Sequence, residues 1–489
     1  MPETLTVNEL LKKTRVIGLF LGPILFLLIY FLVEPGLLSS KSIIVLALGS
    51  WMVTWWATEA MPIPVSALLP MVVFPIMGVS TVKEASAPYG DPVIFLFMGG
   101  FILALGLERH KLHQRIALSL IRITGTSGNG IILGFMLSTA LISMWISNTA
   151  TAIMMLPIAA SVTSLLAKDL GQETDPRFQK FATGLMLSIA YAASIGGMAT
   201  IIGTPPNVVM VGFMKRFYNL DVSFAKWMLI GSPVMLLALT ALYWLITRVL
   251  FKNNLPSIEG SRELIHKKLE DMGPLSKEEK LVLTCFSITC FFWIFRQNLN
   301  GLIGKNLLDD TTIAMAGGML MFLMPVNFKE HKFLLDWSDM KELPWGILLL
   351  FGGGLGLADG MEKSGLVQIV GNYFSTRNDL SVGVLIFLLT AISMGLTELM
   401  SNVALTTIFV PVVFGIADGF HLNPIWLAMP VTFAASCAFM MPISTPPNAV
   451  LFASGYIKMR EMIRTGILLN LCCLAIITVL SLTLMRWLF

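Results

Sequence analysis

Two short polar phrases, made of residue types that bind ions and small ligands, interrupt long apolar stretches of the chain. The phrases are Ser147-Asn148-Thr149 and Ser401-Asn402-Val403, which begin 254 positions apart. Each is followed by a Thr-Pro-Pro-Asn tetrapeptide, at residues 204–207 and 445–448. Polar side chains and prolines in an apolar surround are costly unless they line a cavity. The doubled pattern therefore predicts a transport site.

The chemistry of these phrases suits a cation and an anion side by side. An interrupted helix exposes carbonyls at one end and N–H groups at the other, so one end suits Na⁺ and the other suits a carboxylate. No Arg or Lys adjoins either phrase, so we expect neutral donors to hold the anion and the two ions to bind interdependently. The residues with this chemistry are Asn148, Asn207, Asn402 and Asn448, the hydroxyls of Ser143, Thr149, Thr204, Thr397 and Thr445, and Pro205, Pro206, Pro446 and Pro447.

Helix packing is the plainer alternative, because Ser, Thr and Asn also hydrogen-bond between membrane helices and prolines also kink them. The duplication of phrase and tetrapeptide argues against it. Glu398, four residues before Asn402, is an intramembrane carboxylate and so a candidate functional group, with proton transfer as one role. Its counterpart in the first half is Met144, outside the duplicated pattern. We therefore expect Glu398 to support the site structurally.

Composition places the chain in a lipid bilayer. Apolar residues make up 56% and charged residues 13%, far from an ordinary soluble domain. The net charge of +4 is scattered over short loops and predicts no nucleic-acid partner. The five cysteines lack disulfide or metal-ligand spacing, and no hydrolase, metalloprotease or phosphate-loop motif occurs. We predict a protein that is not an enzyme and has no organic cofactor.

The expected fold is an all-α polytopic membrane protein with about eleven transmembrane spans, two re-entrant hairpins and two broken helices. The hairpin regions, 131–166 and 382–417, hold the Ser-Asn phrases midway, although each could instead be two crossings. Basic flanks put the first hairpin and the N-terminus in the cytoplasm and the C-terminus outside, with the Lys215-Arg216 pair as an exception. Five crossings separate the equivalent elements of the two halves. Because this number is odd, the second half is inserted upside down relative to the first, and the repeat is inverted. The expected crossings are 16–33, 42–58, 63–78, 93–107, 181–214, 227–250, 280–296, 312–325, 345–358, 425–454 and 465–485.

Five regions follow from this repeat. They are the scaffold spans of the first half at 1–122, a first transport region at 123–250, a cytoplasmic linker at 251–279, the scaffold spans of the second half at 280–378, and a second transport region at 379–489.

These motifs resemble the divalent anion/sodium symporter family, in particular its bacterial di- and tricarboxylate carriers. Supporting stretches are 97–101, 144–152, 194–197 and 435–439, so the resemblance covers nearly all of the chain after the first span. It implies a homodimer in the inner (plasma) membrane, whose transport region slides against a scaffold as an elevator. It also implies two or more Na⁺ sites, one at Ser143, Ser147, Asn148 and the Gly203 carbonyl and its twin at Thr397, the Met400 carbonyl, Asn402 and Ser444. The substrate would meet Asn148, Thr149, Thr204, Ser401, Asn402, Val403, Thr445 and Pro446.

The function expected is Na⁺-coupled import of C4-dicarboxylates (succinate, malate and fumarate), with citrate as a further candidate. Val403 removes one hydroxyl where the first half keeps Thr149, so the two carboxylate pockets should be unequal. Some citrate carriers of the family resemble this chain in having Val there. The alternatives are an uncoupled dicarboxylate exchanger and a symporter of sulfate or another oxyanion.

Overall fold

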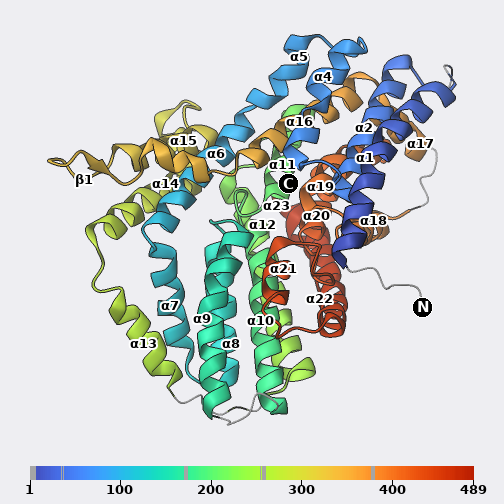
Figure 1. Ribbon diagram of the computed structural model, residues 1–489. Coiled ribbons are helices and arrows are strands. Elements are labelled where there is room, and N and C mark those ends of the chain that lie inside the picture. Colours follow the sequence, from blue (N-terminus) through green and yellow to red (C-terminus); the bar gives the residue numbers. More distant parts are fainter. Residues whose placement is uncertain are drawn as a thin grey trace.

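The computed structural model describes residues 7–34, 36, 38–169, 175–253, 255, 260–375 and 380–489, and these fold almost wholly into helices (Figure 1). The only strands within them are β1 (Pro325–Asn327) and β2 (Lys332–Phe333), which pair antiparallel. The all-α prediction is confirmed.

Helices of the first half begin near the N-terminus and end before the linker. They are α1 (Val7–Leu32), α2 (Ser40–Thr58), α3 (Ile63–Ser66), α4 (Leu69–Ile76), α5 (Val82–Ser86), α6 (Pro92–Arg109), α7 (Leu112–Thr124), α8 (Gly128–Ser143), α9 (Asn148–Asp169), α10 (Pro176–Gly197), α11 (Pro205–Tyr218) and α12 (Phe224–Trp244).

The second half follows the same order after a helix in the linker. Its helices are α13 (Ser261–Asp271), α14 (Lys277–Ile303), α15 (Asp310–Leu323), α16 (Trp345–Lys363), α17 (Leu366–Ser375), α18 (Val382–Leu396), α19 (Asn402–Gly419), α20 (Ile425–Ala435), α21 (Pro446–Phe452), α22 (Met459–Leu480) and α23 (Arg486–Leu488). Shorter helical turns lie at Ala87–Gly90, Leu245–Leu250, Trp337–Glu342 and Ser481–Met485.

Several of these helices are long and apolar enough to cross a membrane. The described residues contain six such segments: Lys13–Leu32, Val82–Arg109, Asn148–Ala167, Phe224–Leu250, Asn402–Gly419 and Met459–Leu488. Each of the eleven expected crossings falls on a helix or on a pair of consecutive helices. A polytopic helical membrane protein is confirmed, and the count of eleven stays a prediction.

The predicted interruptions occur where the polar phrases stand. In the first hairpin region α8 ends at Ser143 and α9 begins at Asn148, and in the second α18 ends at Leu396 and α19 begins at Asn402. The expected broken helices are α10 with α11 and α20 with α21. Both resume at a proline in the first helical position, where the missing N–H costs nothing. Figure 1 shows α8, α9 and α10 side by side, and α10 contacts both hairpin helices.

The two halves meet at equivalent residues. The rings of Phe97 and Phe351, 254 positions apart, have centroids 5.1 Å from each other. Nearby, Gly99 of α6 packs against the carbonyl of Ala314, and its counterpart Gly353 of α16 packs against the carbonyl of Ala67. Each half thus contacts the other through equivalent residues, as expected if an approximate twofold axis relates the two halves.

The region boundaries stay predictions, and two of them meet parts of the chain outside the described residues. Of the linker 251–279, residues 254 and 256–259 are not described, while α13 and the start of α14 occupy its later part. The boundary at 378 and 379 also lies outside the described residues.

The close approach at the two reciprocal glycines leads to a stability prediction. A Cβ atom at Gly99 would lie 2.5 Å from the Ala314 carbonyl oxygen, and one at Gly353 would lie 2.0 Å from that of Ala67. We expect Gly99→Ala and Gly353→Ala each to destabilise the fold by about 1–3 kcal/mol, because backbone cannot yield cheaply. The measurement is the thermal unfolding temperature in detergent.

The matched control is Gly395→Ala, since a Cβ there meets nothing within 4 Å and alanine favours a helix. An unchanged unfolding temperature in either of the two test variants would contradict the reciprocal packing.

Candidate binding site

Each hairpin turn gathers three oxygen atoms around a single hydroxyl proton. Ser143 Oγ lies 2.7 Å from Asn148 Oδ1 and 2.6 Å from the Ala193 carbonyl oxygen. One hydroxyl donates one hydrogen bond, so it leaves one of these two acceptors without a proton. Closely spaced oxygens with too few protons suit a hard cation such as Na⁺.

The second hairpin repeats this arrangement. Thr397 Oγ1 lies 3.0 Å from Asn402 Oδ1 and 2.5 Å from the Ala435 carbonyl oxygen. Thr397 and Asn402 are the 254-residue counterparts of Ser143 and Asn148. The two hairpins therefore present the same set of hydroxyl, amide and carbonyl oxygens.

A buried asparagine closes each helix break. Asn207 Nδ2 donates to the carbonyls of Gly197 (3.0 Å) and Thr200 (2.8 Å), where α10 ends. At the counterpart positions Asn448 Nδ2 donates to Ala438 (2.9 Å) and Met441 (3.1 Å). Carbonyls that lose their helical partners at a break need such donors in an apolar interior.

Unpaired oxygens are duplicated as well. Asn207 Oδ1 and Asn448 Oδ1 are buried and have no hydrogen-bond partner within the described chain, and the same holds for the hydroxyls of Ser194 and Ser436. Ser194 and Ser436 each follow the alanine whose carbonyl the hairpin hydroxyl contacts. Buried oxygens orphaned at matching places in both halves are positions where a further ligand, water or cation, can bind.

The first hairpin and the first break converge. A Cβ atom at Gly197 would lie 2.7 Å from Asn148 Oδ1 and 3.0 Å from the Gly203 carbonyl oxygen. In addition, Thr200 Oγ1 donates to the Met144 carbonyl across the same gap. The structure thus brings together Asn148 and Gly203, two of the predicted Na⁺ ligands, and Ser143 through its contact with Asn148.

Other predicted Na⁺ ligands take different places. Ser147 is exposed and its Oγ accepts from the Ala150 N–H at 3.2 Å, so it caps α9. Ser444 Oγ lies 3.1 Å from the Glu398 carbonyl oxygen and 2.8 Å from Glu398 Oε2. Met400 is half-buried in the turn before α19. The second half therefore keeps the Thr397–Asn402 pair but ties Ser444 to a carboxylate.

The predicted substrate residues lie where the two halves exchange contacts. Helix α9 contacts α21, and α11 contacts α19, so each hairpin packs against the broken helix of the other half. Asn148, Thr149, Asn402 and Val403 occupy the first turns of α9 and α19 and are half-buried. The remaining positions are Thr204 and Thr445, buried at the starts of α11 and α21, Ser401, half-buried, and Pro446, exposed.

Sequence reasoning missed the Ala193 and Ala435 carbonyls, Ser194, Ser436 and the partners of Glu398. The Ala-Ser pairs at 193–194 and 435–436 are themselves a repeat, spaced by 242 positions, and this signal could have revealed them. Nothing in the sequence pairs Glu398 with Asn470, whose Nδ2 lies 3.1 Å from Glu398 Oε1, because these residues are 72 positions apart and have no counterpart phrase.

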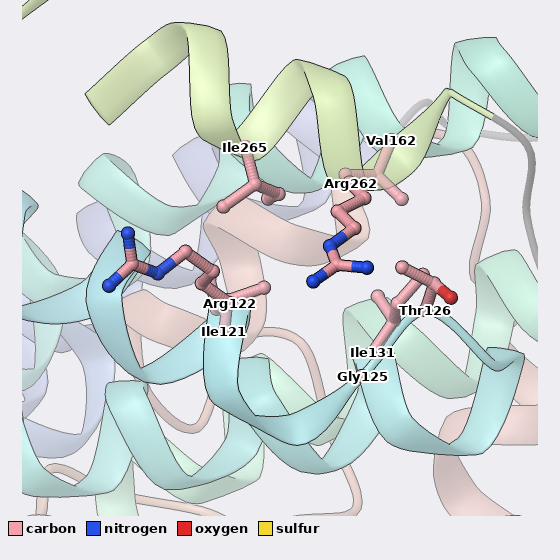
Figure 2. Close-up of a pocket in the computed structure, with 8 residues that line it drawn as sticks. All are labelled: Ile121, Arg122, Gly125, Thr126, Ile131, Val162, Arg262 and Ile265. Carbon is pink, nitrogen blue, oxygen red and sulfur yellow. The ribbon is translucent and has the colours of Figure 1, made fainter. Parts of the chain in front are cut away.

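A small surface pocket lies elsewhere, between α7, the turn after it, α8, α9 and α13. It is lined by Ile121, Arg122, Gly125, Thr126, Ile131, Val162, Arg262 and Ile265. Figure 2 shows the guanidinium of Arg262 extending toward the α7–α8 turn, whereas that of Arg122 points away from Arg262. Neither arginine belongs to the hairpin turns or helix breaks, so this pocket is distinct from the predicted site.

Comparison with known proteins finds relatives over the whole length. A family model described as the sodium:sulfate symporter transmembrane region matches residues 13–489. The sodium-dependent dicarboxylate transporter SdcS of Staphylococcus saprophyticus is 40% identical over 473 residues, covering 96% of this chain and 91% of the relative. SdcS of Staphylococcus aureus strain USA300 is also 40% identical, over 95% of this chain and 90% of its own.

Solved structures resemble the fold at low identity. The YdaH transporter of Alcanivorax borkumensis superposes with a TM-score of 0.57 at 14% identity and covers 98% of both chains. MtrF of Neisseria gonorrhoeae superposes with a TM-score of 0.55 at 11% identity, over 83% of this chain and 84% of that one. These two likenesses concern the fold alone.

The paired asparagines of the helix breaks give a test of the site's architecture. Asn207→Leu and Asn448→Leu keep the branched shape of the side chain but leave two break carbonyls without donors. We expect each to lower the free energy of unfolding by about 1–3 kcal/mol per carbonyl left unpaired. Thermal unfolding in detergent measures this.

Gln368→Leu, at an exposed amide on the surface of α17, is the control. If only one of the two asparagines mattered, the equivalence of the breaks would be refuted.

Proposed function

The chain belongs to the sodium:sulfate symporter family, and we propose that it imports C4-dicarboxylates such as succinate, malate and fumarate together with Na⁺. The observation that carries this proposal is the duplicated oxygen set, Ser143 with Asn148 and Thr397 with Asn402. The relatives named sodium-dependent dicarboxylate transporters support it. On this proposal the chain is a carrier and catalyses no covalent chemistry.

The cations would bind at the two hairpin turns as transported substrates. We assign one site to Ser143, Asn148 and the Gly203 carbonyl, and a second to Thr397, Asn402 and the adjoining turn. Both sets consist of neutral oxygens, the ligands that hard cations prefer. Ser147, Ser444 and Met400 complete these sites only if the turns rearrange when Na⁺ binds, since their present contacts or positions differ.

The anion would bind between the hairpins. Helices α9 and α19 begin at Asn148 and Asn402, so their N-terminal N–H groups and partial positive charge are available to a carboxylate at each end of the ligand. Thr149 adds a hydroxyl on one side, whereas Val403 offers only methyl groups on the other. The two carboxylates of an elongated anion would therefore lie in unequal surroundings, one beside a hydroxyl group and the other beside methyl groups.

Sliding of the transport region against the scaffold is supported by an asymmetry between the halves. Gly100 of α6 packs against Ile202, beside the first helix break, whereas its counterpart Gly354 of α16 packs against Thr407 of α19. Thr407 lies five residues beyond Asn402, about 7.5 Å along the helix. The transport region is therefore displaced from the position that twofold symmetry would give it.

Exposure of side chains follows the same asymmetry. Ile202 is 6% exposed, and its counterpart Ile443 is 59% exposed. Trp145 at the first hairpin turn packs against Phe286 of α14, with ring centroids 4.9 Å apart, while its counterpart Leu399 is 74% exposed. In an alternating-access cycle, the uncovered residues of the second half would become packed when those of the first half are released.

An ion-pair cluster holds the present position. Arg216 at the end of α11 pairs with Asp359 of α16 and, at 3.4 Å, with Asp91 at the start of α6. These pairs join the proposed transport region to both scaffold halves. The predicted topology places Arg216 outside, against the usual preference of basic residues for the cytoplasm. Because Asp359 and Asp91 neutralise Arg216, its position is weak evidence on the topology.

The homodimer, the plasma membrane, the cytoplasmic N-terminus and the outer C-terminus are further parts of the proposal. They rest on the family resemblance and on the distribution of basic residues.

The first functional prediction concerns ion coupling. Purified protein in proteoliposomes should accumulate labelled succinate when Na⁺ is present outside, and uptake should fall to background when choline replaces Na⁺ at fixed pH. Excess malate or fumarate should compete, and sulfate should compete poorly.

Strong competition by sulfate would favour the oxyanion alternative. Uptake that needs internal dicarboxylate and ignores Na⁺ would instead identify an uncoupled exchanger and refute the proposal.

The second functional prediction concerns sliding. In a variant without the five native cysteines, Gly100→Cys with Ile202→Cys should cross-link in the present arrangement, where a Gly100 Cβ would lie 3.2 Å from Ile202 Cγ2. The symmetry-related pair, Gly354→Cys with Ile443→Cys, should cross-link only in the opposite arrangement. Each cross-link should stop uptake, and reduction should restore it.

The two pairs are matched controls for one another, and Na⁺ with succinate should change their cross-linking rates in opposite directions. A Gly354–Ile443 pair that never cross-links under any ligand condition would count against the sliding movement.

A further inference from the structure

Glu398 lies between the second hairpin, the second helix break and α22, where it joins all three. Its carboxylate accepts hydrogen bonds from the N–H groups of Phe439 (2.8 Å) and Met440 (2.9 Å), from Ser444 Oγ (2.8 Å) and from Asn470 Nδ2 (3.1 Å). The residue is buried. Three of these partners, the two N–H groups and the Asn470 amide, can only donate, and the Ser444 hydroxyl can donate as well. A set of donors is the pattern that an ionised carboxylate satisfies.

No cationic side chain neutralises this carboxylate. None of the ion pairs in the described part of the chain includes Glu398, and its four hydrogen-bond partners are all uncharged. A buried charge without a counter-charge is costly even when hydrogen-bonded. The structure therefore leaves a place for a positive charge near Glu398.

The first half shows what this region looks like without the carboxylate. The counterparts of Glu398 and Ser444 are Met144 and Gly203. Gly231 of α12 packs against Met198 and Ala199 of the first break, and Gly466 of α22 packs against their counterparts Phe439 and Met440. Met235 and Asn470 each lie four residues after these glycines, so Met235 is the counterpart of Asn470. An entirely polar cluster in the second half thus replaces two methionines and a glycine.

Backbone hydrogen bonds differ accordingly. In the first break the N–H groups of Met198 and Ala199 donate to carbonyls of α10, at Ile195 and Gly196. In the second break the corresponding N–H groups, of Phe439 and Met440, turn to the Glu398 carboxylate. The carboxylate has thus replaced helix carbonyls, and it brings a full negative charge to one break only.

We propose that Glu398 is the counter-charge and positioning residue of the second Na⁺ site, so that the two sites differ in affinity and the second fills first. This inference rests on the proposed function. Glu398 adjoins Thr397, whose hydroxyl contacts Asn402, and it holds Ser444 by both its carbonyl and its carboxylate. A cation among these oxygens gains from the nearby charge, while the first site has neutral oxygens alone.

The test is a Na⁺ titration of Glu398→Gln, which keeps the shape and removes the charge. Two measurements apply: the rise of the thermal unfolding temperature with Na⁺ alone, and the Na⁺ concentration that gives half-maximal succinate uptake. We expect both midpoints to rise about tenfold or more. Asn470→Leu, which removes one hydrogen bond but keeps the charge, is the control and should shift them much less.

A second variant covers the case in which Glu398→Gln fails to fold. Glu398→Met combined with Ser444→Gly and Asn470→Met copies the three residues that the first half places in the same surroundings. It should fold and also need much more Na⁺. A folded variant of either kind with the wild-type Na⁺ midpoints would overturn the inference.

Failure of the inference and failure of the proposed function are distinguishable. If the wild-type protein takes up succinate without Na⁺, the proposed function is wrong. If wild-type uptake needs Na⁺, and Glu398→Gln loses only the pH dependence of uptake while its Na⁺ midpoints stay unchanged, then Glu398 carries a proton and the counter-charge inference alone is wrong.

Discussion

An apolar interior tolerates interrupted backbone only if every freed carbonyl and N–H finds a partner, and the proposed binding site depends on this constraint. Two asparagines, Asn207 and Asn448, supply donors to the carbonyls at the breaks. Hydroxyls of the hairpin turns contact the next helix in the same way in both halves. These contacts leave more oxygen atoms than there are protons to bind them, and this surplus is the chemical basis of the proposed cation sites.

Symmetry holds inside each region but fails between the regions. Within the proposed scaffold, Phe97 meets Phe351 and the glycines at 99 and 353 make reciprocal contacts. Within the proposed transport region, the hydrogen bonds of the hairpin hydroxyls and of Asn207 and Asn448 are repeated. Between the two, Ile202 is covered and Ile443 is not. If each of these two regions is symmetric by itself, the transport region can take a second position against the scaffold in which the roles of the two halves are exchanged. The packing would be similar in both positions, and a carrier needs two such positions in order to face both sides of a membrane.

The sequence predicted the helical membrane fold and a candidate position for the site, because prolines and Ser-Asn phrases in apolar stretches have a strong physical meaning and occurred twice. It expected interruptions at the Ser-Asn phrases, and the structure has them at 144–147 and 397–401; Asn148, Asn402 and Gly203 stay predicted ligands. It failed where partners are distant or where backbone atoms take part. Asn470 joins Glu398 across 72 positions, and the repeated Ala-Ser pairs at 193–194 and 435–436 do not say that the alanine carbonyls are the contacting atoms. Backbone oxygens take part through geometry, which only folding determines.

Divergence between the halves then decides the order of events at the site. A dicarboxylate carries two negative charges, and Glu398 already places one beside the second hairpin with no cationic side chain to offset it. The anion would meet repulsion in the ion-free site, whereas Na⁺ would meet attraction. If the proposed sites are correct, cation binding would precede substrate binding and would begin in the half that holds the carboxylate. The neutral first half, with Met144 and Thr149 where the second has Glu398 and Val403, would then complete the site around the bound anion.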